Sequence, residues 1–410
     1  MRSFEDAFAP LKIGPLTLRN RFVKAATNEG KAKGCVVSKG LAQFHERIAE
    51  GGVGMTTLAY CAVSRDGRTF PDQVVLDDAS ISDLRALTEG VHRHGAAVSA
   101  QITHGGCFNL LGKDMLQADR PLSSSGGFNK VGVMSGHYFK KAMDRADMDE
   151  MTAQFVASAV RAREAGFDAV ELHMGHGYLL SQFISKVYNK RRDEYGGGIK
   201  GRLAYPSEVL GRVLDTVGKD MAVLVKFSMT DGPKGNTIED GIEVARCMES
   251  AGAHMCVLSN GLNVESVETM FGSSIPNGGF SEAPNSLIVM AMWLQSLTKA
   301  RKLRFHENYL RDYAVQVRRA VTMPLAFLGG VTSKEGVEQV MQDGFDAITL
   351  GRALLFDPSF INALQEERIT RSGCTACNNC VAVMYSPEGT HCVLTPEKPD
   401  PLLNTLPASV

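Results

Sequence analysis

Three side chains able to donate hydrogen bonds, His173, His176 and Tyr178, lie within a stretch of six residues. They follow residues 168–172, a short apolar segment that predicts a buried β-strand. Two imidazoles can hold the oxygen of a carbonyl group through two hydrogen bonds. A phenol at the next turn can deliver a proton to a neighbouring carbon. The spacing therefore favours chemistry on a carbonyl compound where this strand ends.

The two histidines also permit two other interpretations. His-x-x-His can be a metal-binding pair, although on a loop it lacks the helical spacing of four residues and a nearby third ligand. The imidazoles can also be core side chains that are satisfied by backbone groups. Taken alone, this stretch leaves a metal pair and a core pair open beside the carbonyl-binding site.

Two glycine-bearing segments closer to the C-terminus resemble a phosphate site. Residues 324–330 and 345–352 each read as an apolar strand that runs into a helix. In an eight-stranded α/β barrel, the ends of strands seven and eight direct backbone N–H groups at a phosphate. The predicted phosphate residues are Gly329, Gly330, Gly351 and Arg352, with Arg352 as the charged partner.

Four cysteines near the C-terminus have the spacing of cluster ligands. Cys374, Cys377, Cys380 and Cys392 are separated by two, two and eleven residues. This spacing suits an iron–sulfur cluster, and it would also suit tetrahedral zinc. Four free thiols are the third interpretation.

Composition restricts the class of protein. The chain has 410 residues, of which 44% are hydrophobic and 22% charged, with a net charge of −1. No basic stripe indicates a nucleic-acid partner, and no apolar run reaches the length that spans a membrane. The first ten residues carry charges where a signal peptide would be apolar, and nine cysteines argue against a disulfide framework. We expect a soluble, cytoplasmic protein that forms homo-oligomers.

Alternating strand and helix patterns predict the α/β class and a single (β/α)8 TIM barrel. We expect the barrel over residues 1–365 and a short Cys-rich extension over 366–410, packed on the barrel. Residues 10–18 predict a small hairpin that closes the barrel bottom. The predicted barrel strands are 20–26, 53–60, 96–103, 168–172, 221–228, 254–259, 324–330 and 345–352. The predicted helices are 39–50, 79–94, 148–165, 202–217, 236–251 and an insertion at 283–304, with a long loop at 105–147.

Longer sequence strings carry a family resemblance. The run Glu-Leu-His-Met-Gly-His-Gly-Tyr-Leu-Leu at 171–180, Asn-Lys-Arg-Arg-Asp-Glu-Tyr-Gly-Gly at 189–197 and the opening Pro-Leu-Lys-Ile-Gly resemble the old yellow enzyme family of FMN-dependent ene-reductases. The two-histidine motif and the cysteine tail are most similar to the branch that includes 2,4-dienoyl-CoA reductase and trimethylamine dehydrogenase. Those enzymes carry a [4Fe-4S] cluster on the tail and continue into a second nucleotide-binding module, whereas we expect this chain to end without one.

The resemblance implies an FMN site inside the barrel mouth. Small residues would face the flavin ring, a polar side chain would bind its C4 carbonyl, and Gln101 would meet the pyrimidine edge. Lys226 would lie near flavin N1 and the C2 oxygen, and a lysine on an apolar strand is costly without such an anion. The remaining implied residues are Ala25 and Ala26 against the ring, Thr27 or Asn28 at the C4 carbonyl, and the four phosphate residues named above. Where most members have arginine near the site, this chain has Cys107, which puts anionic or CoA-linked substrates in doubt.

The resemblance also implies a reaction. NAD(P)H would reduce FMN, and hydride would pass to the β-carbon of an activated alkene, an α,β-unsaturated carbonyl compound. His173 and His176 would hold the carbonyl oxygen, and Tyr178 would protonate the α-carbon. One alternative is a flavin-dependent dehydrogenase or demethylase that exchanges electrons with a separate partner protein. The other is a non-catalytic flavin and iron–sulfur subunit for electron transfer.

Overall fold

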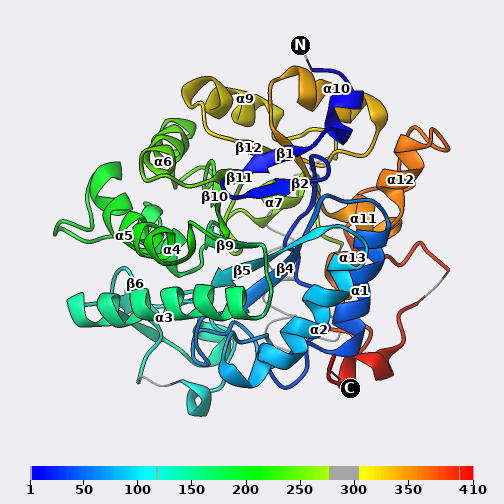
Figure 1. The fold of residues 1–410 in the computed structure, drawn as a ribbon. Coiled ribbons are helices and arrows are strands. Elements are labelled where there is room, and N and C mark those ends of the chain that lie inside the picture. Colours follow the sequence, from blue (N-terminus) through cyan, green and yellow to red (C-terminus); the bar gives the residue numbers. More distant parts are fainter. Residues whose placement is uncertain (1, 117–118, 277–303, 397, 410) are drawn as a thin grey trace.

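The computed structural model describes residues 2–116, 119–276, 304–396 and 398–409 (Figure 1). Eight parallel strands close into a barrel, as the sequence predicts. In chain order the strands are β3 (Phe22–Lys24), β4 (Met55–Ala62), β5 (Ala97–Thr103), β9 (Ala169–Met174), β10 (Ala222–Ser228), β11 (Met255–Ser259), β12 (Leu325–Leu328) and β13 (Ala347–Leu350). The fold class is therefore confirmed.

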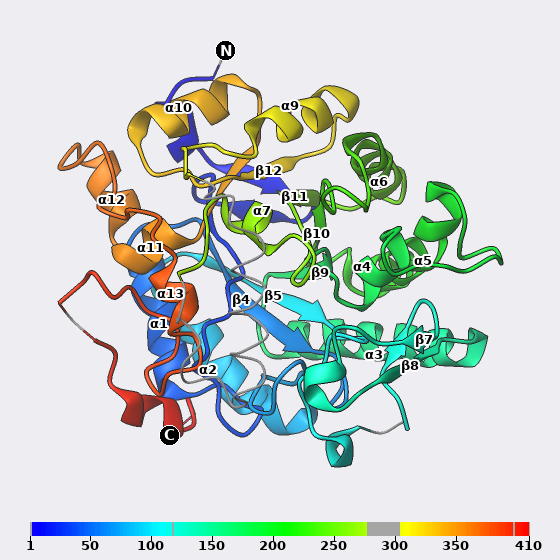
Figure 2. The same cartoon turned by 180° about the vertical axis from the view of Figure 1, so that it is seen from behind.

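Helices surround the barrel on all sides (Figures 1 and 2). The longer ones are α1 (Lys39–Glu50), α2 (Ile81–His92), α3 (Arg145–Glu164), α5 (Ile199–Val217), α6 (Ile238–Ser250), α9 (Arg311–Ala320) and α10 (Lys334–Gln342). Short helices α4 (Leu179–Ile184), α7 (Val267–Phe271), α11 (Arg352–Phe356), α12 (Phe360–Gln365) and α13 (Asn379–Ala382) follow strand ends or lie in the tail. Most of the insertion predicted at 283–304 lies outside the described residues.

The hairpin predicted at the start of the chain closes the lower end of the barrel. Strands β1 (Leu11–Ile13) and β2 (Leu16–Leu18) pair antiparallel, and their apolar side chains pack on the barrel interior. The turn requires glycine, because Gly14 has φ +55° and a Cβ there would lie 2.6 Å from the ring of His254. With this end filled, the open end of the barrel is where the strands finish.

Some boundaries differ from the prediction for local reasons. The long helix α3 begins three residues before the predicted start, because Asp144 and Asp147 form a capping box at its N-terminus. The segment predicted as a long loop at 105–147 contains a small sheet of β6 (Leu122–Ser123), β7 (Gly127–Phe128) and β8 (Phe139–Ala142). Its strands are two to four residues long, which is too short to leave a periodic pattern.

The Cys-rich tail packs along the barrel instead of extending away from it. Its backbone bonds to the loop after β3, where the N–H of Thr390 donates to the carbonyl of Glu29 at 2.7 Å. Near its end, the N–H of Lys39 donates to the carbonyl of Leu406 at 2.7 Å, so the tail also borders the start of α1. Figure 1 shows this segment in orange and red beside α1. Among the described helices, none is long and apolar enough to cross a membrane.

Candidate active site

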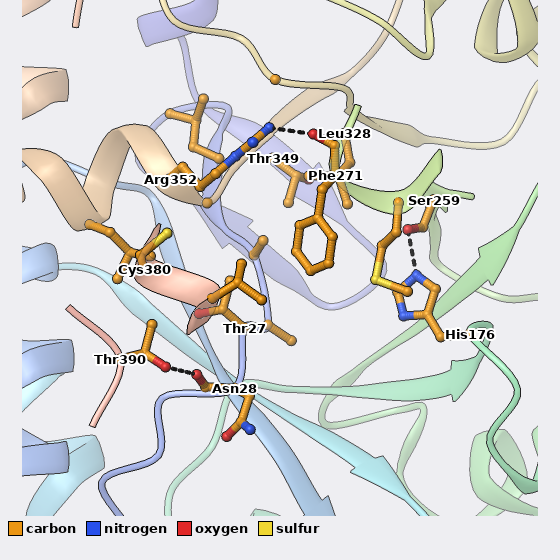
Figure 3. A pocket seen from close by; sticks show the side chains of 18 of the residues that line it. Thr27, Asn28, His176, Ser259, Phe271, Leu328, Thr349, Arg352, Cys380 and Thr390 are labelled. Carbon is orange, nitrogen blue, oxygen red and sulfur yellow. Dashed lines mark hydrogen bonds between the residues drawn. The ribbon is translucent and has the colours of Figure 1, made fainter. Parts of the chain in front are cut away.

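A cavity of about 330 Å³ opens where the barrel strands end (Figure 3). It gathers residues from every part of the sequence that was assigned to the site. The predicted residues that line it are Ala25, Ala26, Thr27, Asn28, Gln101, His173, His176, Tyr178, Lys226, Gly330, Gly351, Arg352, Cys374 and Cys380. Gly329 is not among the lining residues, and a Cβ added there would meet the ring of Phe327. Sequence positions more than 300 residues apart therefore meet at one surface.

One wall carries a buried lysine that is only weakly bonded to the protein. Lys226 is 4% exposed, and its Nζ donates a long bond of 3.4 Å to the carbonyl of Ala26. Burial lowers the pKa of Lys226, while the carboxylates of Glu171 and Glu29 oppose that shift. Glu171 lies on the neighbouring strand β9 and accepts a hydrogen bond of 2.6 Å from Gln101 on β5. A cation held beside a cavity with so little direct pairing fits an anionic or electron-rich ring edge, as the flavin pyrimidine would provide.

His173 presents a defined hydrogen-bond donor. The N–H of Gly175 donates to its Nδ1 at 3.3 Å, so the ring proton belongs on Nε2. Burial, with further contributions from His176 and Lys226, holds the pKa of His173 well below its usual range. The ring is therefore neutral and carries one N–H with no partner among the described residues.

His176 is fixed from two sides by serines. Its Nε2 lies 2.7 Å from Oγ of Ser259 at the end of β11 (Figure 3), and its backbone N–H donates to Oγ of Ser228 at 3.1 Å. The residue has φ +63°, a left-handed conformation that is uncommon for a side chain of this size. Burial and Lys226 hold the pKa of His176 well below its usual range. Ser259 was not predicted from the sequence, although a serine that ends an apolar strand is a signal for such a role.

The two imidazoles fit the carbonyl-binding interpretation better than the others. Their ring centroids are 4.9 Å apart, and both rings line the cavity. Among the described residues, no three His, Cys, Asp or Glu side chains are arranged to hold a metal ion. Each ring has a hydrogen bond on one nitrogen only among the described residues, so the pair is more than a satisfied part of the core.

The ring of Tyr178 packs against three other rings. Its ring centroid is 4.7 Å from that of His173, 5.2 Å from that of Tyr60 and 5.7 Å from that of Phe108. The side chain is 5% exposed, and burial raises the pKa of Tyr178 to about 12. The phenol therefore stays protonated at neutral pH and lies beside the imidazole of His173.

Arg352 stands between the cavity and the tail. Its guanidinium donates to Oδ1 of Asn378 at 2.6 Å, to the carbonyl of Phe271 at 2.8 Å and to Oγ of Ser273 at 3.3 Å. The tail residue Asn378 in turn donates to Oγ of Ser273 at 2.8 Å. The arginine that was predicted to bind phosphate therefore also joins the loop after β11 to the Cys-rich tail.

The four tail cysteines line one small pocket together with Arg352, and Cys374 and Cys380 also reach the main cavity. Burial raises the pKa of the Cys380 thiol to about 11, while Arg352 lowers it and the other three thiols raise it. Four thiols in one pocket are the donor set that an iron–sulfur cluster or zinc needs. Within the described residues they are not drawn together into a metal-ligand group. Cys107 is buried apart from the cavity, in a cluster with Tyr188 and Leu262.

A buried ion pair supports the loop that carries residues 25–28. Nζ of Lys24 donates to a carboxylate oxygen of Glu29, and the two side chains are 2% and 3% exposed. The carbonyls of Asn28 and Glu29 accept from the side chain and backbone of Thr390. The ion pair thus lies directly behind the cavity wall that the tail covers.

We expect Glu29→Gln to lower the free energy of unfolding by about 3–5 kcal/mol, because Lys24 would stay buried without its counter-charge. Urea unfolding followed by circular dichroism measures the change. The double variant Lys24→Met/Glu29→Gln removes both charges and should recover most of the loss. A double variant as unstable as Glu29→Gln alone would show that the buried charge is not the cause.

Comparisons with known proteins identify similar sequences and a similar fold. The model of the NADH:flavin oxidoreductase / NADH oxidase family matches residues 6–277. A 4,4'-dithiodibutanoate disulfide reductase of Rhodococcus erythropolis is 36% identical over 392 residues, which are 94% of this chain and 94% of that protein. An NADH oxidase of Thermoanaerobacter brockii is 30% identical over 92% of this chain, which spans only 54% of that protein. The solved structure of an old yellow enzyme homologue from Zymomonas mobilis has a TM-score of 0.69 at 20% identity, over 90% of this chain and 94% of that one.

Proposed function

This chain belongs to the NADH:flavin oxidoreductase / NADH oxidase family, and on that premise we propose that it is an FMN-dependent reductase of activated alkenes. NAD(P)H is the reductant, and the substrate is an α,β-unsaturated carbonyl compound. The observation that carries the proposal is the convergence of two neutral imidazoles and one buried phenol on a single cavity. FMN, when bound, would supply the hydride that it takes from NAD(P)H.

The two histidines would bind the carbonyl oxygen of the substrate. His173 offers its Nε2–H, since Nδ1 already accepts from Gly175. When the hydroxyl of Ser259 donates to Nε2 of His176, the proton of that ring belongs on Nδ1, which is then the donor. Two such donors stabilise the negative charge that develops on the oxygen, each by about 2–4 kcal/mol.

Tyr178 would supply the proton that completes the reaction. Its neighbours are the aromatic rings of Tyr60 and Phe108 and the imidazole of His173, so water has little access to the phenol. A buried general acid beside the bound carbonyl compound, here the Tyr178 phenol, can protonate the α-carbon.

The lining of the cavity supports a neutral, flat substrate. Lys226 and Arg352 are the only lysine and arginine among the described lining residues, and both are assigned to FMN. The rest of the wall includes Phe108, Phe271 and Tyr385. A substrate with its own carboxylate or phosphate would find no spare positive partner there.

A second candidate is the reduction of an organic disulfide. The relative from Rhodococcus erythropolis is named for that activity and matches almost the whole of both chains. Two cysteines, Cys374 and Cys380, reach the cavity. Against this candidate, the butanoate groups of that substrate are anionic, and the described lining offers no unassigned cation. The dehydrogenase and electron-transfer alternatives receive less support, because they leave the His173, His176 and Tyr178 set without a role.

A comparison of three substrates tests the proposal. FMN-loaded protein would be assayed without oxygen for NAD(P)H oxidation with 2-cyclohexenone, with saturated cyclohexanone and with 4,4'-dithiodibutanoate. We expect turnover with the enone and none with the saturated ketone. The rate with the disulfide should be lower than the rate with the enone. Turnover with the disulfide alone would replace the first candidate by the second.

We expect the alkene-reducing step to be independent of pH between about pH 6 and 9. The pKa of Tyr178 is raised to about 12, so this acid keeps its proton until the pH approaches that value, and the rate should fall only there. The pKa values of His173 and His176 are depressed, so both rings are already neutral at pH 6. Stopped-flow rates across this range measure the profile. An inflection near pH 6.5 would show that at least one of the histidines titrates normally.

A further inference from the structure

Two residues outside the predicted site flank the hydroxyl group of Tyr178. Tyr60, near the end of β4, has its ring centroid 5.2 Å from that of Tyr178, and its hydroxyl acts to lower the pKa of Tyr178. Asn263, in the loop after β11, lies close to the same phenol, and its Nδ2 is a buried donor with no hydrogen bond among the described residues. Both side chains line the cavity.

The hydroxyl proton of Tyr60 can point toward either of two acceptors. Its Oη lies 3.2 Å from Oγ1 of Thr69, and Thr69 donates its own hydroxyl proton to Oε1 of Gln73 at 3.0 Å. The amide of Gln73 closes the loop by donating to the backbone carbonyl of Tyr60 at 2.8 Å. With Thr69 donating to Gln73, the Tyr60 proton can point either at Thr69 or at Tyr178.

We propose that Tyr60 and Asn263 are positioning residues that stabilise the phenolate left on Tyr178 after it protonates the substrate. The inference rests on the proposed alkene reduction. In that step the O–H bond of Tyr178 breaks and a C–H bond forms at the α-carbon with the electron pair of the enolate. The negative charge passes to the phenol oxygen, and no further reductant is consumed. A proton from solvent later restores the phenol.

The arrangement suits an anion that exists only during turnover. A phenolate in a buried site needs donors, because water cannot solvate it there. Nδ2 of Asn263 has no competing partner, and the Tyr60 hydroxyl can rotate from Thr69 to the new anion. Both neighbours act to lower the pKa of Tyr178 against the larger effect of burial, as donors to its anionic form would.

The plain alternative is that Tyr60 only packs. Its ring meets Phe70 at 6.1 Å and Tyr178 at 5.2 Å between centroids, contacts that a phenylalanine would keep. Tyr60→Phe therefore deletes the hydroxyl and retains the ring. Tyr205→Phe is a matched control, since Tyr205 is fully buried, lies outside the cavity lining and donates to the carbonyl of Met148 at 3.3 Å.

A nitroalkene separates the two chemical steps, because hydride addition yields a nitronate that persists in water until it is protonated. We expect Tyr60→Phe and Asn263→Leu to consume NAD(P)H at close to the wild-type rate while protonated product forms about 10- to 100-fold more slowly. These two variants would then release nitronate, as we also expect of Tyr178→Phe. Tyr205→Phe would behave as wild type.

Two outcomes would overturn the inference while alkene reduction stands. One is product formation at the wild-type rate in both variants, and the other is an equal loss in NAD(P)H consumption and protonation, as misplaced substrate would cause. Wild-type protein that fails to reduce any alkene would instead remove the proposed function, and the inference with it, before a variant is needed.

Discussion

Replacing Tyr178 with phenylalanine is expected to slow reduction of an α,β-unsaturated ketone by about 10²- to 10⁴-fold, the usual contribution of a general acid. Reduction of bound flavin by NAD(P)H should keep its wild-type rate, because that step needs no proton from the phenol. The ring would remain packed against His173, Tyr60 and Phe108, so the variant should fold and bind FMN.

Stopped-flow absorbance measures the two half-reactions of Tyr178→Phe separately. Tyr205→Phe again serves as the control for loss of a buried tyrosine hydroxyl outside the cavity. If both half-reactions slowed together, the phenol would have a general role in the site. If neither slowed, another group would be the proton donor.

Removal of the His176 side chain should produce the second large effect. His176→Ala is expected to lower the rate of the alkene half-reaction by about 10²- to 10³-fold, as the loss of one preorganised donor does. The position has φ +63°, which asparagine tolerates better than most residues, and asparagine keeps an N–H donor. His176→Asn should therefore recover a large part of the rate.

The comparison of the two substitutions separates hydrogen bonding from structure. Both variants lose the contact between Nε2 and Ser259, so a loss that came from that contact alone would be equal in both. Equal rates in His176→Ala and His176→Asn would contradict a donor role for His176. Urea midpoints of the two variants show whether stability differs.

Most of the fold could be predicted because its elements carry strong local signals. The helix predicted over residues 39–50 matches α1 at both ends, where Ser38 caps the first turn through the N–H of Leu41. The hairpin before β3 and the buried strands were likewise visible as short apolar runs between glycines and polar residues. The six-residue helix α4 was missed, because it is fully buried and therefore has no amphipathic period.

Only part of the site could be predicted from the sequence in the same way. His173, His176 and Tyr178 stand together in the sequence, so their convergence follows from one strand end. Tyr60 and Asn263 come from other strand ends, and nothing in their own neighbourhoods sets them apart. Their significance comes from distances to Tyr178 that depend on how the barrel closes.

The tail illustrates the same limit. The spacing of its cysteines indicated a metal cluster, but it did not indicate that Cys374 and Cys380 border the main cavity. That proximity depends on hydrogen bonds between Arg352, Asn378 and Ser273, which lie in three separate segments. Contacts of this kind leave no periodic or compositional mark.

The most direct test of the account follows the visible absorption of the FMN-loaded protein without oxygen. One equivalent of NAD(P)H should bleach the flavin bands, and subsequent addition of 2-cyclohexenone should restore them with one equivalent of saturated ketone formed. Cyclohexanone should restore nothing. Flavin bands that stay bleached after the enone, or protein that takes up no FMN at all, would contradict the claim that this cavity reduces activated alkenes.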